Sequence, residues 1–150
     1  MEQAKIQWER VKRYYTRFKA LNDGIEHAMS SEHCVDDIYA FFQNCYHLKD
    51  WIKNDNTAPA AKRKGVEGYV KSHDCLKLCA DICNGLKHLT LHSKPKSGSK
   101  PALKGRTFGV KLGGATQTIS VKQTIEHAGK EKDAFTLAGE CMKAWEPYMT

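Results

Sequence analysis

Apolar residues recur at three- and four-residue steps along most of this chain, and that spacing lines one face of an α-helix. The longest pattern of this kind covers residues 72–92. Comparable patterns predict helices over residues 3–29, 31–54 and 126–148, with a shorter helix over residues 61–71. The chain is therefore expected to be mainly helical.

The pattern changes its period after residue 106. Residues 107–112 and 116–122 are rich in β-prone side chains, and Gly113-Gly114 between them is a hairpin turn signal. A two-stranded hairpin is marginal alone, so we expect it to lie on the helices. The 150 residues are predicted to form a single domain. Its fold class is a mainly α helical bundle of three long helices plus a short one, with an inserted two-stranded β-hairpin before the C-terminal helix.

Positive charge is concentrated in one segment of the chain. The formal net charge is +7, and no acidic residue lies between Asp81 and Glu126. A basic loop and the hairpin make up an insertion at about residues 92–125. The cations between the two acidic residues are Lys87, Lys94, Lys96, Lys100, Lys104, Arg106, Lys111 and Lys122. Such a cluster attracts phosphate groups, whereas the alternative is a surface loop that is charged only to stay solvated.

Hydropathy argues against a membrane protein. No apolar run approaches the roughly 20 residues that span a bilayer. The N-terminal segment carries charges where a signal peptide would be apolar. We therefore expect a cytoplasmic protein with no membrane partner.

The cysteine spacing indicates thiols that pack in a core. Cys75, Cys79 and Cys83 recur every four residues on one predicted helix, where they are poorly placed to form disulfides with one another. The six cysteines form no paired CxxC motif, and the histidines lack zinc-finger spacing. Reduced, buried thiols are therefore favoured, and no metal or other cofactor is expected.

Candidate chemistry gathers on the central predicted helix. Asn84 and His88 are four residues apart, so their side chains can meet on one face. Asp81 and Lys87 lie within the same two turns. At the end of the preceding long helix, Tyr46, His47, Lys49 and Asp50 carry polar-tipped side chains, and Tyr46, Lys49 and Asp50 are taken as a second polar group of the site. These groups are the candidate site, with His88 and Asn84 in the catalytic positions.

The segment CNGLKH, residues 83–88, and the order of helices resemble the HEPN superfamily, compact helical bundles of prokaryotic toxin, antiviral and RNA-processing systems. Family ribonucleases use an arginine followed four to six residues later by a histidine, often with a polar residue directly after the arginine. His88 matches that histidine and Asn84 the polar position, while Cys83 stands where the arginine is expected. The resemblance covers roughly residues 31–92, and YHLKDW at residues 46–51 is similar to uncharacterised bacterial proteins related to this group.

The resemblance implies metal-independent RNA cleavage, in which His88 would move a proton of the attacking 2′-hydroxyl or of the leaving group. A guanidinium would hold the phosphate by two hydrogen bonds, and Cys83 cannot do this. Lys87 and Lys49 are point charges on flexible stems and do not replace that geometry. The implied function is therefore an RNA- or nucleotide-binding protein of a bacterial defence, toxin or mobile-element system, with weak or no ribonuclease activity.

Three alternatives stay open at this point. The chain could instead be a non-catalytic partner-binding or dimerisation module, antitoxin-like or structural, that binds a second copy or a cognate protein through exposed aromatic residues. Asn84 and His88 could simply hydrogen-bond inside the bundle. A nucleophilic cysteine paired with a histidine is disfavoured, because the helix's cysteines lie on its apolar side.

Overall fold

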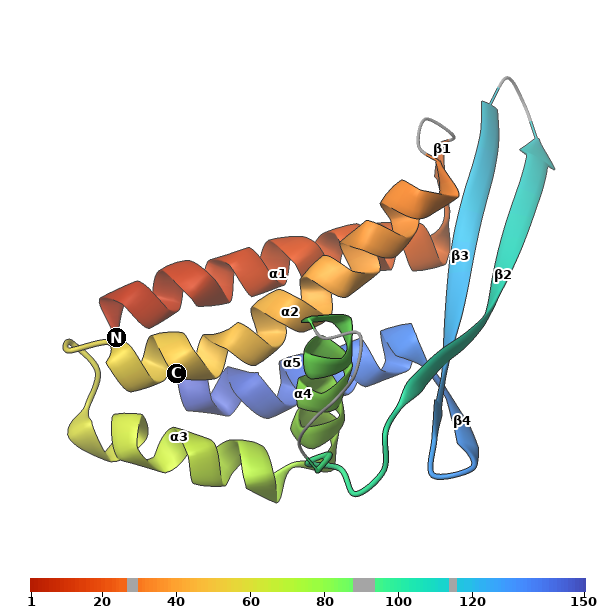
Figure 1. Cartoon of the computed structure of the whole chain (residues 1–150). Helices are drawn as coiled ribbons and strands as arrows, with labels where there is room; N and C mark the ends of the chain where they lie inside the picture. The colour runs from red at the N-terminus through yellow and green to blue at the C-terminus, as the bar shows by residue number, and fades with distance from the viewer. Residues whose placement is uncertain (27–29, 88–93, 114–115) are drawn as a thin grey trace.

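The computed structural model describes residues 1–26, 30–87, 94–113 and 116–150 (Figure 1). The described helices are α1 (Glu2–Asp23), α2 (Ser31–Asn54), α3 (Ala60–Ser72), α4 (Asp74–Lys87) and α5 (Ala134–Met149). The described strands are β1 (Ile25–Glu26), β2 (Ala102–Gly113), β3 (Thr116–His127) and β4 (Lys130–Asp133). In this part of the chain, no helix is both long and apolar enough to cross a bilayer.

Helix α2 is the centre of the packing, because it contacts all four other helices. It runs back along α1, and α5 lies beneath the pair (Figure 1). The core at this junction is aromatic: Phe41 and Phe42 of α2 both contact the Phe18 ring of α1. All three rings are buried, so the apolar stripes predicted for these helices face one another.

Polar side chains fix where helices begin. Asp133 accepts a hydrogen bond from the Thr136 N–H at 2.8 Å and caps the start of α5. Asp55, just after α2, accepts bonds from the Ala4 N–H at 2.9 Å and from the N–H and hydroxyl of Thr57. One buried carboxylate therefore joins the first turn of α1 to the end of α2.

Strand β3 is the middle of the antiparallel sheet. It pairs with β2 along one edge and with β1 and β4 along the other. Val121 and Ile125 of β3 are buried in the core, and β3 packs on α1 and α5. The far part of the β2–β3 pair extends past the helices (Figure 1). The insertion is thus attached at its base, and its outer length projects from the body.

The pairing of β2 with β3 slips between Leu103 and Arg106. Buried Gln123 spans the irregularity: its amide donates to the Lys104 carbonyl at 3.1 Å and to the Thr124 carbonyl at 3.0 Å. The register shift is therefore stabilised by hydrogen bonds of its own, as expected for a β-bulge.

The prediction of a mainly helical chain with an antiparallel β-insertion is confirmed. The prediction of helix over residues 126–133 is wrong, because β3 continues to His127 and β4 follows it. Ala128 and Gly129 turn the chain there with φ angles of 52° and 73°, outside the helical region. The first helix also ends earlier than predicted, since Gly24 has a φ of 112°.

The cysteine prediction is confirmed for the thiol state. None of the six cysteines, all of which lie within the described residues, forms a disulfide; five are buried, while Cys75 is partly exposed. The Gly113-Gly114 turn falls in part outside the described residues, as does the end of the predicted central helix with His88.

Candidate functional site

Asp81 anchors the basic loop to helix α4. Its side chain is only 2% exposed, and its carboxylate accepts hydrogen bonds from the Lys96 N–H at 2.8 Å and the Ser97 N–H at 2.7 Å. The Ser97 hydroxyl donates to the same carboxylate. Hydrogen bonds to an ionised group are about twice as strong as neutral ones. Lys96 and Ser97 of the basic loop are therefore held in a defined position beside α4.

The anchored loop places Lys96 on the aromatic ring of Tyr46 in α2. The Lys96 ammonium donates to the Tyr46 hydroxyl at 3.1 Å and lies 5.3 Å from the ring centroid. The Lys49 ammonium lies 4.9 Å from the same centroid. Two cations from segments far apart in sequence thus lie beside one tyrosine, Lys96 at its hydroxyl and Lys49 nearer its ring.

Two carboxylates offset part of this charge. The Lys49 ammonium contacts Asp50 at 2.5 Å and Glu67 of α3 at 3.4 Å, while Lys53 contacts Glu67 at 3.5 Å. Burial lowers the pKa of Lys49, but Asp50, Tyr46 and Glu67 outweigh it and raise that pKa above its ordinary value. Lys49 is therefore charged at neutral pH although it is only 7% exposed.

The charge of Lys96 also acts on Glu67. Burial raises the pKa of Glu67, but the charges of Lys49, Lys96 and Lys53 lower it below its ordinary value. Three ammonium groups thus face the two carboxylates of Asp50 and Glu67, which leaves an excess of positive charge. We call this group, with the neighbouring His47, the Tyr46 site; its members are Tyr46, His47, Lys49, Asp50, Lys53, Glu67 and Lys96.

His47 is the imidazole that the sequence interpretation left out of the candidate site. Its side chain is exposed, and its Nε2 lies 3.9 Å from the Cys83 sulfur. Asn84, the next residue of α4, is partly exposed. His88 and the side chain of Lys87 lie outside the described residues. The sequence had placed His47 among the polar side chains at the end of this helix, next to Tyr46 and Lys49, but gave it no role in the site.

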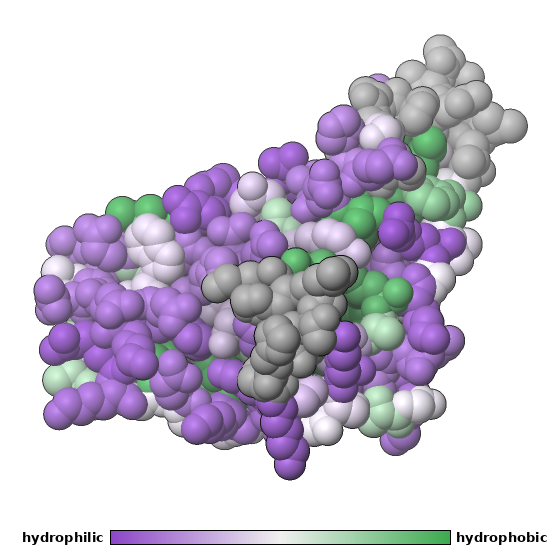
Figure 2. Space-filling view, in the orientation of Figure 1, coloured by the Kyte–Doolittle hydropathy of each residue, from purple (hydrophilic) through white to green (hydrophobic). Residues whose placement is uncertain are grey.

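The other predicted phosphate-binding residues spread along the loop and β2. Lys94 is exposed, and Lys100 lines a shallow hollow of about 140 Å³ with Asp81 and Gly85. Lys104 pairs with Glu126 at 3.0 Å, and Arg106 is exposed on β2. The face that carries this loop is largely hydrophilic, with hydrophobic residues gathered between the helices and the hairpin (Figure 2).

Phe108 supplies an aromatic ring to the basic strand. It is 45% exposed and lies two residues beyond Arg106 on β2, so both side chains project from one face of the strand. Strand β2 therefore presents a cation and a ring that a base could stack on.

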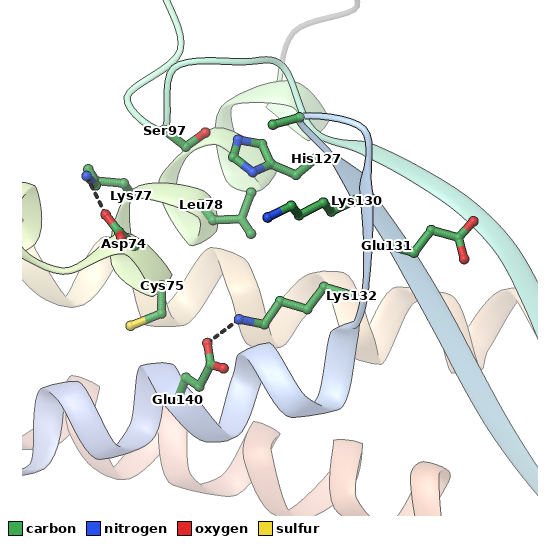
Figure 3. Close-up of a pocket in the computed structure, with 11 residues that line it drawn as sticks. Asp74, Cys75, Lys77, Leu78, Ser97, His127, Lys130, Glu131, Lys132 and Glu140 are labelled. Carbon is green, nitrogen blue, oxygen red and sulfur yellow. Dashed lines mark hydrogen bonds and ion pairs between the residues drawn. The ribbon is translucent and has the colours of Figure 1, made fainter.

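A second hollow of about 500 Å³ lies between the start of α4, the β3–β4 turn and α5 (Figure 3). The His127 ring and the Lys130 side chain point into it. Asp74 pairs with Lys77 at 2.6 Å, and Glu140 pairs with Lys132 at 2.5 Å. The acidic and basic side chains that line this hollow are equal in number. None of its residues was among the site residues predicted from the sequence.

Comparisons of the chain with protein-family models, with curated proteins and with solved structures find no match. The HEPN resemblance of residues 31–92 therefore rests on the sequence alone.

Proposed function

We propose that this chain binds single-stranded RNA, with the backbone phosphates against the Tyr46 site and the basic loop. The observation that carries the proposal is the hydrogen bond from the Lys96 ammonium to Tyr46, with the backbone N–H of Lys96 bound to the Asp81 carboxylate. This hydrogen bond places the Lys96 ammonium of the loop near the Lys49 ammonium of α2, at a site that also contains the exposed imidazole of His47. Phosphate oxygens would offset the positive charge that the two nearby carboxylates leave in excess.

The strand pair extends this surface. Lys100, Lys104 and Arg106 follow the loop in chain order, and no acidic residue interrupts the segment before Glu126. Phe108 offers a face for stacking of an unpaired base. A backbone that runs from the Tyr46 site along β2 would meet three cations and then the ring of Phe108, which favours single-stranded nucleic acid over duplex.

We infer little or no RNA cleavage by this site. Cys83 occupies the position where the HEPN resemblance expects arginine, and it is 3% exposed. The ammonium groups of Lys49 and Lys96 cannot supply the paired hydrogen bonds of a guanidinium. In this proposal the chain is a HEPN-like helical domain that retains RNA binding, in a bacterial defence, toxin or mobile-element setting.

A direct test is the affinity of labelled single-stranded RNA for wild type and for Lys96→Ala at low salt. The proposal requires binding by wild type and weaker binding by the variant. Equal affinities, or no binding by wild type, would exclude the Tyr46 site as the phosphate contact.

One observation favours a second candidate, a partner-binding or dimerisation module. Strand β2 pairs only with β3 among the described strands, so the backbone groups of its outer edge are open over a strand of 12 residues. Such an edge can add a strand from another chain. A dimer in solution that dissociates when a proline replaces Thr107 would support this candidate, whereas a monomer at all concentrations would exclude a homodimer.

A further inference from the structure

Three cysteine sulfurs converge in the core from three different helices. Cys45 comes from α2, Cys79 from α4 and Cys141 from α5, and each residue is 0% exposed. The three sulfur atoms all lie within 4.8 Å of one another. Apolar packing alone needs no such convergence, because alanine or valine fills the same space without bringing sulfur atoms together.

A buried donor beside this cluster has no acceptor. Trp145 is 1% exposed, and its indole Nε1 makes no hydrogen bond to any described residue. After Cys141 and Cys79, the Trp145 side chain is one of the groups that lower the pKa of the Cys45 thiol. A neutral thiol is a weak acceptor, whereas a thiolate accepts a hydrogen bond strongly. The orphaned N–H is therefore in the place where a donor would support a deprotonated Cys45.

We propose that Cys45, Cys79 and Cys141 bind a thiophilic d¹⁰ cation, of which Zn²⁺ is the representative. Zinc binds thiolate sulfur at about 2.3 Å in tetrahedral geometry, which sets neighbouring sulfurs about 3.8 Å apart. The sulfur atoms lie within 4.8 Å of one another, so each pair must approach by at most about 1 Å to reach that spacing. Each thiol releases its proton to solvent as its sulfur bonds to the metal, so three thiolates and one Zn²⁺ carry a net charge of −1.

The present hydrogen bonds of the cluster are weak enough to be exchanged for metal bonds. The Cys79 thiol donates to the Phe42 carbonyl at 3.4 Å, and the Cys141 thiol donates to the Cys75 carbonyl at 3.4 Å. On metal binding, the Trp145 N–H becomes the donor to the Cys45 sulfur. Such outer hydrogen bonds orient metal ligands and stabilise their charge.

Cys75 connects the buried cluster to the surface. Its sulfur interacts with that of Cys141, and its residue lines the 500 Å³ hollow beside His127 and Glu140 (Figure 3). Cys75 therefore lies between the hollow and the sulfur of Cys141. The bound ion would tie α2, α4 and α5 together, independently of any RNA binding.

The test begins with wild type, purified under reducing conditions, freed of metal and given one equivalent of Zn²⁺ or Co²⁺. The proposal predicts about one tightly held ion per chain, thiolate-to-cobalt charge-transfer bands and the visible bands of tetrahedral Co²⁺. A wild-type protein that takes up neither ion, or binds Co²⁺ without sulfur bands, would overturn the proposal.

Single variants locate the site. Cys45→Ser, Cys79→Ser and Cys141→Ser should each lose the charge-transfer bands, whereas Cys34→Ser should keep them. Cys34 is the matched control, because it is 4% exposed in the same core but outside the cluster. Bands that survive in all three cluster variants would also overturn the proposal. If a variant fails to fold, the wild-type spectrum still decides the question.

Discussion

The Lys96 ammonium donates a hydrogen bond to the Tyr46 hydroxyl at 3.1 Å, across 50 positions of sequence. This bond joins the basic loop to helix α2, while Asp81 holds the same loop to α4. The two attachments turn a lysine-rich loop into part of a defined surface. A loop that was charged only for solubility would need neither of them.

Tyr46→Phe removes the hydroxyl acceptor and keeps the ring, whereas Tyr46→Leu removes both. We expect Tyr46→Phe to lower the free energy of unfolding by about 1 kcal/mol and to weaken RNA binding slightly. Tyr46→Leu should weaken RNA binding further, because both lysines lose the ring that positions them. Urea unfolding and RNA titration measure the two effects, with Tyr39→Phe on the same helix as control. Wild-type RNA affinity in Tyr46→Leu would contradict the role of the ring.

Asp81→Ala should release the loop from α4. The Lys96 and Ser97 N–H groups then lose a charged acceptor, and we expect the free energy of unfolding to fall by about 2 to 3 kcal/mol. Hydrogen exchange at these two amides should become faster, and RNA affinity should fall with it. Asp36→Ala removes an exposed carboxylate of α2 and serves as the control. Slow exchange at both amides in Asp81→Ala would show that the carboxylate does not hold the loop.

Asp55 should make folding stability sensitive to acid. Burial raises the pKa of this carboxyl, but hydrogen bonds from the Ala4 N–H and from Thr57 outweigh burial and bring the pKa to about 2. The unfolded chain has an aspartate pKa of about 3.9. The stabilisation of the folded chain by the Asp55 carboxylate is therefore complete above a pH of about 3.9. It is lost as the pH falls through about 2.

The Asp55→Asn variant isolates this contribution. Its free energy of unfolding should lie below that of wild type at pH values near neutral, and the difference should shrink by about 2 kcal/mol on acidification. Urea unfolding of both proteins across the acidic range measures the difference. A difference that does not change with pH would mean that the pKa of Asp55 is the same in the folded and unfolded chains.

RNA cleavage should be at background level in wild type. We expect His88→Ala and His47→Ala to leave the amount of cut RNA unchanged, since Cys83 stands where the resemblance to HEPN ribonucleases would expect an arginine. Incubation of end-labelled RNA with each protein, and with His33→Ala as an exposed control, measures this. Cleavage that either of the first two variants abolishes and the control retains would establish a ribonuclease.

Strong local patterns made much of the fold predictable. The apolar stripes of α2 and α4 are long, so their existence followed from periodicity alone. Residues 126–133 misled the interpretation, because several charged residues there have no apolar period and Gly129 was not recognised as a turn residue. The two-residue strand β1 exists only because β3 offers it an edge, so no local signal predicts it.

The candidate site was predictable in its parts and not in its assembly. Tyr46, Lys49 and Asp81 stood out as polar residues on helical faces, but their contact with Lys96 depends on the path of a loop without periodicity. The thiol cluster was missed because it too depends on contacts between segments that are far apart in the sequence. The spacing of Cys75, Cys79 and Cys83 is visible in one helix, whereas Cys45 and Cys141 come from helices that meet it only in the folded chain.

RNA affinity as a function of salt tests the central claim most directly. Two variants carry the same change in net charge: Lys94, Lys96, Lys100 and Lys104 are changed to alanine in one, and Lys5, Lys64, Lys71 and Lys143 in the other. The control lysines are exposed on α1, α3 and α5. Fluorescence anisotropy of labelled single-stranded RNA gives the affinity of each protein.

We predict that wild-type affinity falls steeply with salt, and that the loop variant loses affinity and has a shallower slope, by up to about 3 in log K against log salt concentration. The control variant should keep nearly the wild-type slope. Equal losses in the two variants, or no RNA binding by wild type at low salt, would contradict the account.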